Sequence, residues 1–412
     1  MATAPEATVS TAPEATVIVD KWVYGGEGLA RVDGRVVLTP FVLPGEKVRI
    51  EIGEGVNARL AEVIERSPDR VEPPCPLFAR CGGCHYQHAP YEFQLARKVE
   101  ILREQLRRVG KIEYTGEIET ISGPPLGYRN RVQVHILSSG RAGRRLGYLA
   151  RRSHKLVPLT EDCPVASPRL NQALAGMRTR LHDARFPRFV RSLELFTNET
   201  DVQVNVIDTD RPLRRDFFDW CESVNTLDYS TALGTFRVGP RSFFQVNRFL
   251  IEKLVDAALD GSEGSTALDL YAGVGLFAIP MARRFGSVTA VEAGSSAVRD
   301  LEVTAAGALR VEHSRVEDYV ARLETRPDFI LADPPRAGLG KEVVRHLNRL
   351  APPRLTIVSC DPATLARDLA ALPGYSIDRL TLVDLFPQTY HIETLAHLRL
   401  NEDQLSAGLQ RF

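Results

Sequence analysis

The stretch Leu268-Asp-Leu-Tyr-Ala-Gly-Val-Gly-Leu-Phe277 decides the fold expected for the second half of this 412-residue chain. An apolar strand runs into a Gly-x-Gly turn, and a helix is expected after Gly275. Strand, tight turn and helix in this order are typical of the crevice of an open α/β sheet. Apolar runs alternate with helical patterns around it, so residues 241–412 are predicted to form a doubly wound, Rossmann-like domain with a parallel sheet.

The same turn indicates the ligand. Glu292 ends the next predicted strand, 17 residues after Gly275. An acid at that place commonly binds ribose hydroxyls, whereas the third glycine of the dinucleotide-binding pattern is absent. S-adenosylmethionine is therefore favoured over NAD, although a lone Gly-x-Gly also occurs in plain tight turns.

Two further strand ends carry candidate chemistry. The run Leu355-Thr-Ile-Val-Ser-Cys-Asp-Pro362 places Cys360 at the carboxyl end of a buried strand, and Phe329-Ile-Leu-Ala-Asp-Pro-Pro-Arg336 ends in a similar way. A thiol beside a cofactor crevice is a candidate nucleophile. The alternative is an inert core cysteine, which is the commoner role of a lone cysteine.

The first 240 residues have a different pattern. The segment Thr-Ala-Pro-Glu-Ala-Thr-Val occurs at residues 3–9 and again at 11–17, and residues 1–16 are predicted to be a disordered tail. Short alternating strands over residues 17–70 predict a small β-barrel of the oligonucleotide-binding type. Residues 71–240 are predicted to form a central, mainly β domain with a helix near 168–184. An amphipathic helix over 92–110 is a candidate to pack on the catalytic domain.

Cysteine spacing in the central domain indicates a metal centre. Cys75, Cys81 and Cys84 lie within ten positions, and Cys163 is remote. Four thiolates suit tetrahedral zinc or a 4Fe–4S cluster, and three clustered cysteines with one distant cysteine favour the cluster. Zinc remains the alternative. Cys221 has no evident partner and is expected in the core.

Charge is uneven in a chain of zero formal net charge. Residues 127–215 hold 17 Lys and Arg against 8 Asp and Glu, which predicts a polyanion-binding surface, with a solvated arginine-rich face as the alternative. Arg144 and Arg145, with Tyr128 and Tyr148 interleaved, are candidates for phosphates and unstacked bases of RNA.

Two further expectations concern the RNA contacts of the barrel and the location of the protein in the cell. The barrel is predicted to contact RNA, if at all, through Lys21, Trp22 and Tyr24. No apolar run is long enough to span a bilayer and no signal-peptide pattern is present, so a cytoplasmic location is expected.

Taken in order, these motifs resemble those of the RNA uracil-C5 methyltransferases that carry an iron–sulfur cluster. The resemblance covers about residues 17–400 and is carried by Tyr24-Gly-Gly-Glu-Gly-Leu-Ala-Arg31, Cys81-Gly-Gly-Cys84, Gly127-Tyr-Arg-Asn-Arg131, Ser242-Phe-Phe-Gln-Val-Asn247, Asp333-Pro-Pro-Arg-Ala-Gly338, Ser359-Cys-Asp-Pro362 and Tyr390-His-Ile-Glu393. It implies a TRAM domain for the barrel and a 4Fe–4S cluster on Cys75, Cys81, Cys84 and Cys163.

The resemblance also implies roles for single residues. Cys360 is expected to be the nucleophile and Glu393 the general base. The residues expected at S-adenosylmethionine are Gln245, Tyr271, Gly273, Gly275, Leu276, Glu292 and Asp333. Two departures stand out: Leu276 occupies a position that is often polar, and residues 303–318 lack the usual Asn-Ala signature, which leaves the adenine contacts undefined.

The implied reaction requires these residue types. C5 of uracil is weakly nucleophilic until a thiolate adds at C6, and a base must afterwards remove the C5 proton. Cys360 must therefore ionise, and Arg336 is the hypothesised cause. The expected substrate is structured RNA, 23S ribosomal RNA above all, acted on by a monomer. The same reaction on the T-loop of transfer RNA and a non-catalytic RNA-binding or assembly protein are the alternatives, with a metabolic oxidoreductase the weakest.

Overall fold

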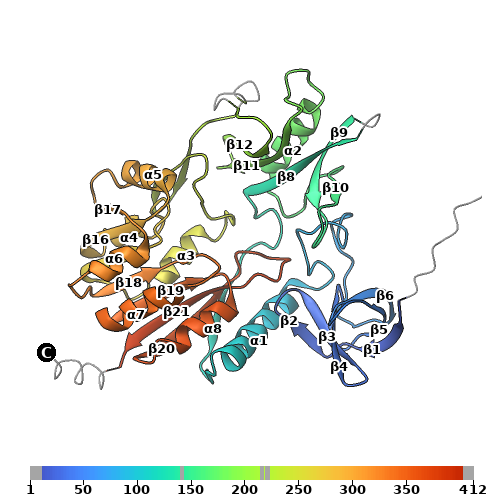
Figure 1. The fold of residues 1–412 in the computed structure, drawn as a ribbon, viewed down its shortest axis with the longest axis horizontal. Helices are drawn as coiled ribbons and strands as arrows, with labels where there is room; N and C mark the ends of the chain where they lie inside the picture. Colours follow the sequence, from blue (N-terminus) through green and yellow to red (C-terminus); the bar gives the residue numbers. More distant parts are fainter. Residues whose placement is uncertain (1–11, 140–142, 214–217, 219–222, 402–412) are drawn as a thin grey trace, which may run out of the picture. The chain divides into compact units, whose positions relative to one another are not determined.

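The computed structural model describes residues 12–139, 143–213, 218 and 223–401 (Figure 1). Residues 1–11 of the predicted tail, Arg141 and Cys221 lie outside the described residues. The chain divides into two compact units. The first contains Met1–Ala79, Cys84–Ile101 and Gln388–Tyr390, and the second contains Arg80–Gly83, Leu102–Pro387 and His391–Phe412.

The first unit is built mainly from short antiparallel strands. One three-stranded sheet contains β1 (Glu14–Ile18), β5 (Lys47–Ile52) and β6 (Ala58–Glu65), and another contains β2 (Lys21–Val23), β3 (Glu27–Val32) and β4 (Arg35–Pro40). Alternate apolar residues form the core, which includes Val17, Val19, Ala30, Val37, Val48 and Ile50. Residues 14–16, predicted to be disordered, pair with β5, because apolar Ala15 and Val17 pack against that core.

Trp22 belongs to the interior of the first unit rather than to its surface. Its side chain is 3% exposed, its ring stacks on Tyr86 with centroids 4.1 Å apart, and its indole N–H donates to the Val42 carbonyl at 2.7 Å. The prediction that Trp22 contacts RNA is therefore wrong. Lys21 and Tyr24 remain partly exposed.

In the second unit, a five-stranded antiparallel sheet has the order β10-β9-β8-β11-β12. Its strands are β8 (Arg131–Ser139), β9 (Gly143–Leu149), β10 (Leu156–Pro158), β11 (Val190–Thr197) and β12 (Val202–Thr209). Helix α2 (Pro168–Arg180) packs on this sheet, capped by Ser167, and a hairpin of β13 (Leu227–Thr231) and β14 (Gly234–Val238) follows.

An eight-stranded sheet forms the rest of the second unit, in the order β17-β16-β15-β18-β19-β21-β20-β7. Its strands are β15 (Gly264–Leu270), β16 (Phe285–Glu292), β17 (Arg310–His313), β18 (Phe329–Ala332), β19 (Arg354–Ser359), β20 (Tyr375–Val383), β21 (Glu393–Leu400) and β7 (Ile118–Ile121). The helices of this region are α3 (Ile251–Ala258), α4 (Ala278–Met281), α5 (Ser295–Ala305), α6 (Val316–Arg322), α7 (Gly340–Leu350) and α8 (Pro362–Ala370).

The sheet is mixed rather than wholly parallel as predicted. The five strands from β17 to β19 are parallel, but β21 is antiparallel to both β19 and β20. In the chain, β20 is followed directly by β21 without an intervening helix. A crossover helix is needed only between parallel neighbours, so this connection fits an antiparallel pair.

Two segments that precede the five-stranded sheet in the chain belong to the region of the eight-stranded sheet: β7 joins it as a strand, and the end of α1 lies near α8. β7 pairs with β20, although the sequence placed residues 118–121 in the central domain. Helix α1 (Tyr91–Val109) belongs to the second unit from Leu102 on, and Gly110 lies so close to α8 that a Cβ would approach the Ala366 carbonyl oxygen at 2.6 Å. The four residues of β7 have no local sequence pattern that would predict which sheet they join.

Strand direction brings three loops to one edge. β15, β18 and β19 are parallel neighbours, so the residues that follow them, Tyr271, Asp333 and Cys360, leave the sheet at its carboxyl edge. No helix among the described residues is long and apolar enough to cross a membrane.

Candidate active site

Cys360, Asp333 and Glu393 meet at the carboxyl edge of the sheet. Asp333 follows β18 and Cys360 follows β19. Glu393 opens β21, whose antiparallel direction places its first residue at this same edge, where Thr394 pairs with Ser359. The structure thus brings together the nucleophile and the base that the resemblance implied.

The two carboxylates are buried. Glu393 is 5% exposed, and burial raises its pKa well above the ordinary value, with Asp333 adding to the rise and Arg336 opposing it. Burial likewise raises the pKa of Asp333. Neighbouring carboxyl groups whose pKa values are raised can hold and release a proton near neutral pH.

Cys360 is a thiol rather than a thiolate in this setting. Burial raises its pKa to about 11, Glu393 adds to the rise, and Arg336 lowers it without cancelling the other effects. The hypothesis that Arg336 ionises Cys360 therefore has the correct sign, but burial outweighs the arginine.

The start of α8 explains why the helix does not activate the thiol. Asp361 caps α8 by accepting hydrogen bonds from the N–H groups of Ala363 at 2.9 Å and Thr364 at 3.0 Å. The Asp361 carboxylate thus satisfies N–H groups that could otherwise stabilise a thiolate, and its negative charge also raises the Cys360 pKa.

Glu292 links the two sides of the predicted cofactor crevice. One carboxylate oxygen accepts the Gly273 N–H at 2.9 Å and the other accepts the Gly294 N–H at 2.6 Å. The carboxylate is fixed between the Gly-x-Gly turn and the loop after β16, and each oxygen keeps a lone pair for a ribose hydroxyl.

The two glycines of the turn serve different purposes. At Gly273 (φ +56°) a Cβ would meet nothing within 4 Å, so the backbone there faces open space. At Gly275 (φ +94°) a Cβ would meet Leu301 Cδ1 at 2.5 Å, so this glycine permits the close packing of α5. Leu276 is 7% exposed and packs in the apolar core, so its side chain offers no polar contact at this turn.

Asp269 is a candidate residue that the sequence analysis did not single out. Its side chain is fully buried, and neither carboxylate oxygen has a hydrogen-bond partner among the described residues. Burial raises its pKa well above the ordinary value, and the carboxylates of Asp333 and Glu292 contribute to the rise. The backbone N–H of Ala278 opposes this rise, and a cationic ligand beside the turn would be a further stabilising partner for the carboxylate. The sequence feature that could have identified Asp269 is its position inside the motif that ends in the Gly-x-Gly turn.

The loop that carries Gln245 is anchored from two sides. Asp300 of α5 accepts the Gly239 N–H at 2.8 Å and the Ser242 hydroxyl at 2.5 Å. From β8, Arg131 donates two hydrogen bonds of 3.0 Å to the Ser242 carbonyl while its guanidinium lies 4.1 Å from the Phe196 ring centroid. Asp300 sits within an ordinary helix, so no sequence signal identified it.

The cysteines expected to bind metal are divided between the units. Cys75 and Cys84 belong to the first, and Cys81 and Cys163 to the second. Within the second unit, burial raises the Tyr148 pKa, and the charges of Cys163 and Cys81 contribute to that rise. Across the described residues, no three Cys, His, Asp or Glu side chains form a group that could hold a metal ion. The geometry therefore does not support the predicted metal centre.

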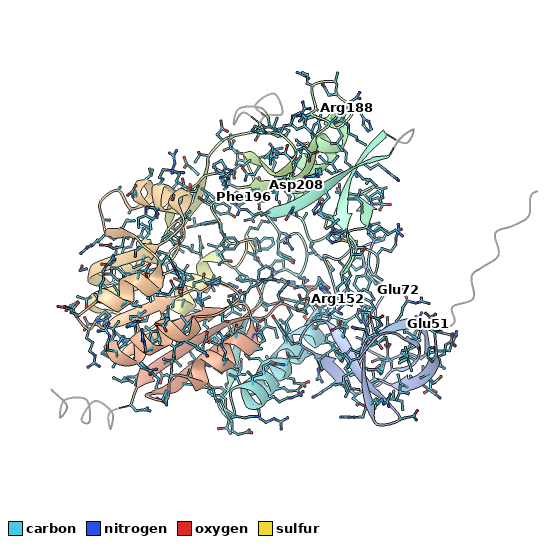
Figure 2. All side chains as sticks on the ribbon, viewed as in Figure 1. Glu51, Glu72, Arg152, Arg188, Phe196 and Asp208 are labelled. Atoms are coloured by element: carbon cyan, nitrogen blue, oxygen red, sulfur yellow. The ribbon has the colours of Figure 1, made fainter. Side chains whose placement is uncertain are left out.

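Several residues predicted to contact RNA have structural roles. Tyr128 is fully buried and donates to the Pro387 carbonyl at 3.0 Å, and the Tyr148 hydroxyl is buried. Arg144 donates to the Phe186 carbonyl at 3.1 Å. The basic side chains that remain exposed include Arg145 together with Arg152 and Arg188, which are labelled in Figure 2.

Three comparisons connect these features with known proteins. Residues 301–400 match the family model described as tRNA (Uracil-5-)-methyltransferase. The 23S rRNA (uracil(1939)-C(5))-methyltransferase RlmD of Halomonas elongata is 33% identical over 92% of this chain and 88% of that protein. The protein of the same name from Methylococcus capsulatus is 34% identical over 92% of this chain and 95% of that protein.

A solved structure shares the fold. The Pyrococcus abyssi tRNA (uracil-54, C5)-methyltransferase, crystallised with S-adenosyl-L-homocysteine, superposes with a TM-score of 0.74. It is 24% identical to this chain, and the match covers 93% of this chain and 100% of the other.

The two glycines provide a matched pair of variants. Gly275→Ala should lower the free energy of unfolding by about 2–4 kcal/mol, because left-handed strain adds to overpacking against Leu301. Gly273→Ala should cost only about 1–2 kcal/mol but weaken S-adenosylmethionine binding, because its Cβ enters open space. Urea unfolding and calorimetry measure both effects. Equal loss of stability in the two variants would contradict this assignment.

The raised pKa of Cys360 predicts slow alkylation at neutral pH. Because the thiolate is the reactive form, modification of Cys360 by iodoacetamide should increase with pH toward a midpoint near 11. Arg336→Gln should move that midpoint upward, since the guanidinium favours the thiolate. Peptide mass spectrometry separates Cys360 from the other cysteines. Half-maximal modification at or below pH ~7, the range of an activated thiol, would refute the assigned pKa.

Proposed function

Because the chain belongs to the RNA uracil-C5 methyltransferases, which use S-adenosylmethionine, we propose that it methylates C5 of a specific uridine in 23S ribosomal RNA. The observation that supports this most strongly is the convergence of Cys360 and Glu393 at the strand ends, beside the Gly-x-Gly crevice. A buried thiol and a buried carboxylate are the two groups that the reaction requires.

In the proposed reaction, Cys360 loses its proton to solvent, and its Sγ then forms a bond with C6 of the flipped uracil. The electron pair of the C5–C6 double bond moves onto the ring as an enolate. C5 would then take the methyl group, whose bond to the sulfonium sulfur breaks and leaves S-adenosylhomocysteine. Bound S-adenosylmethionine supplies an electrophilic methyl group, and its positive charge favours the ionised forms of nearby acids. The carboxylate of Glu393 next removes the C5 proton, the C5–C6 double bond re-forms and the bond from Sγ to C6 breaks.

The raised pKa values give this sequence a physical basis. A protonated Cys360 is protected from unproductive thiolate chemistry until substrates bind. The raised pKa of Glu393, caused first by burial and then by Asp333, makes it a better proton acceptor than an exposed carboxylate once it is ionised. In this proposal Cys360 and Glu393 are protonated in the free protein, and bound cationic S-adenosylmethionine shifts them toward their charged forms.

S-adenosylmethionine would be held by groups around the crevice. Glu292 would accept hydrogen bonds from the ribose hydroxyls, and Asp269 and Asp333 would face the cationic part. Gln245 and Tyr271 would complete the contacts, with Gly273 and Gly275 shaping the turn and Leu276 behind it.

Two RNA classes compete as substrate. The RlmD relatives are named for uracil 1939 of 23S ribosomal RNA, which supports the ribosomal assignment. The family model and the Pyrococcus abyssi protein are named for transfer RNA, which supports the alternative.

An assay with methyl-labelled S-adenosylmethionine on unmodified 23S ribosomal RNA and unmodified transfer RNA tests the function. 5-Methyluridine should appear in the ribosomal RNA, detected by nucleoside mass spectrometry. Cys360→Ser should abolish it while retaining cofactor binding, because the hydroxyl cannot replace the thiol as nucleophile. Product in transfer RNA alone would replace the substrate assignment. Near-normal turnover by Cys360→Ser would eliminate the covalent route.

Glu393→Gln isolates the role of the base. Turnover should fall by roughly 10²- to 10⁴-fold, the usual contribution of general base catalysis, and a covalent protein–RNA adduct should accumulate on denaturing gels. The double variant Cys360→Ser, Glu393→Gln is the control and should form no adduct. Normal turnover without accumulated adduct would show that a group other than Glu393 removes the C5 proton.

A 4Fe–4S cluster on Cys75, Cys81, Cys84 and Cys163 remains a proposal supported by cysteine spacing and not by the geometry described above. We assign it a structural role and no step of the reaction. Anaerobically purified protein should contain iron and inorganic sulfide and absorb broadly in the visible range. Zinc in place of iron, or no metal at all, would disprove the cluster.

A further inference from the structure

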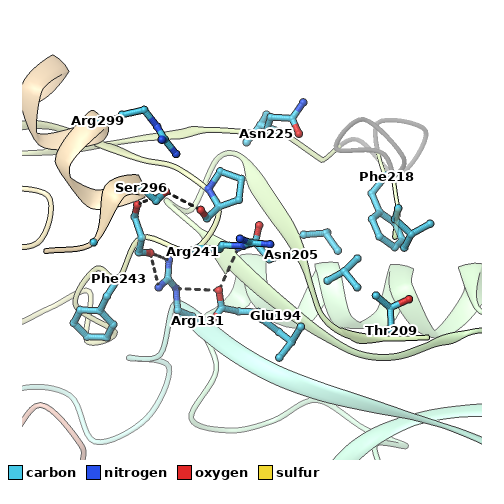
Figure 3. Close-up of a pocket in the computed structure, with 18 of the residues that line it drawn as sticks. Arg131, Glu194, Asn205, Thr209, Phe218, Asn225, Arg241, Phe243, Ser296 and Arg299 are labelled. Carbon is cyan, nitrogen blue, oxygen red and sulfur yellow. Dashed lines mark hydrogen bonds and ion pairs between the residues drawn. The ribbon is translucent and has the colours of Figure 1, made fainter. Parts of the chain in front are cut away.

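A cavity of about 960 Å³ lies in the second unit, away from Cys360 and Glu393. One side is formed by residues of β11 and β12, and the other by the loop 240–243 and the start of α5, residues 294–299 (Figure 3). Its volume is at the upper end of the range for small-ligand sites. Neither the cofactor proposal nor the catalytic group uses this space.

The charge on the cavity lining is positive. Among the described residues, three arginines, Arg131, Arg241 and Arg299, line it against a single acid, Glu194. Arg131 is 7% exposed, lies 3.9 Å from Glu194 and is bound to the Ser242 carbonyl, so it serves as part of the wall. Two cations then remain for a ligand.

Arg241 and Arg299 are those two cations. Both side chains are exposed, and within the described ranges neither forms an ion pair or a hydrogen bond with another residue. Figure 3 shows Arg299 extending from α5 over the cavity and Arg241 on the loop below it. Two unpaired arginines from different segments on one side of a cavity are suited to a phosphate, which accepts several N–H bonds at once.

Polar groups on the lining add a second kind of recognition. Asn225 and Ser295 are exposed there, and Ser296 is partly exposed. Amide and hydroxyl groups can read the edge of an unstacked base. A phosphate with a base attached satisfies both sets of groups, whereas an inorganic anion satisfies only the arginines.

The cavity is connected to the proposed cofactor site through one short loop. Arg241, Ser242 and Phe243 line the cavity, and Gln245 follows two residues later. Ser242 is bonded to both Asp300 and Arg131. A ligand in the cavity therefore contacts the same anchored loop that carries a residue assigned to S-adenosylmethionine.

From this arrangement we infer that the Arg241–Arg299 cavity binds a phosphate-bearing nucleotide of the substrate RNA other than the target uridine. This inference rests on the proposed function, because that function makes RNA the substrate. It requires the RNA to present two unstacked nucleotides at once, one at Cys360 and one in the cavity. Such a requirement selects loops over regular helices, whose bases are paired.

Binding measurements on the full-length protein test the inference without relying on turnover. Arg241→Gln and Arg299→Gln, singly and together, are compared with wild type for binding of an unmodified 23S ribosomal RNA transcript at several salt concentrations. Each substitution should raise Kd roughly three- to tenfold and lower the salt-dependence slope by about 0.7, as expected for one lost phosphate contact. Arg299→Lys should recover part of the affinity.

Arg326→Gln is the matched control. Arg326 is an exposed arginine just before β18, at the amino edge of the sheet, and has no ion pair among the described residues. Its loss should leave Kd and the salt slope unchanged. Calorimetry should show normal S-adenosylmethionine binding for all variants, which excludes damage to the loop as the cause.

Two outcomes would overturn the inference. If the cavity variants have the same RNA affinity and salt slope as wild type and Arg326→Gln, the cavity does not bind RNA. Binding of free AMP that Arg299→Gln abolishes, with RNA affinity unchanged, would assign the cavity to a free nucleotide. If wild type methylates neither RNA yet Arg299→Gln weakens RNA binding, the proposed function fails and the cavity assignment stands.

Discussion

The direction of the strands in the eight-stranded sheet is the constraint on which the site depends. Parallel pairing of β15, β18 and β19 sends three loops to one edge, and antiparallel β21 returns Glu393 to the same edge. If β21 were parallel to β19, its first residue would lie at the opposite edge, a strand length from Cys360. The reversal of β21 in this mixed sheet is therefore what brings Glu393 to the edge that holds Cys360.

Burial at this edge controls protonation. Cys360, Glu393, Asp333 and Asp269 all have pKa values raised first by loss of water, and Arg336 opposes the rise at Cys360 and Glu393. Such a group of acids is costly to ionise together, because each negative charge disfavours the next. In the function proposed above, a positively charged methyl donor would offset that cost, which would connect cofactor binding to the protonation of Cys360.

The loop from Gly239 to Gln245 connects the five-stranded sheet with Gln245, a residue proposed to bind the cofactor. Asp300 of α5 and Arg131 of β8 both form hydrogen bonds with this loop, so its position depends on both elements. A buried arginine with two hydrogen bonds and an aromatic ring beneath it has little freedom to move. The cavity lined by Arg241 and Arg299 opens on this same loop, so the RNA contacts proposed there would lie next to a residue proposed to bind the cofactor.

The sequence by itself determined the alternation of strands and helices, the Gly-x-Gly turn, and Cys360 and Asp333 at strand ends, because apolar periodicity and turn residues act locally. The pairing of β7 with β20, the reversal of β21 and the burial of Trp22 and Tyr128 needed the tertiary structure, because they depend on neighbours distant in the chain. Asp300 and Arg131 acquire their roles only through partners more than fifty residues away. The protonated state of Cys360 was likewise decided by the fold, since desolvation by the surrounding chain outweighs the arginine that the sequence had placed nearby.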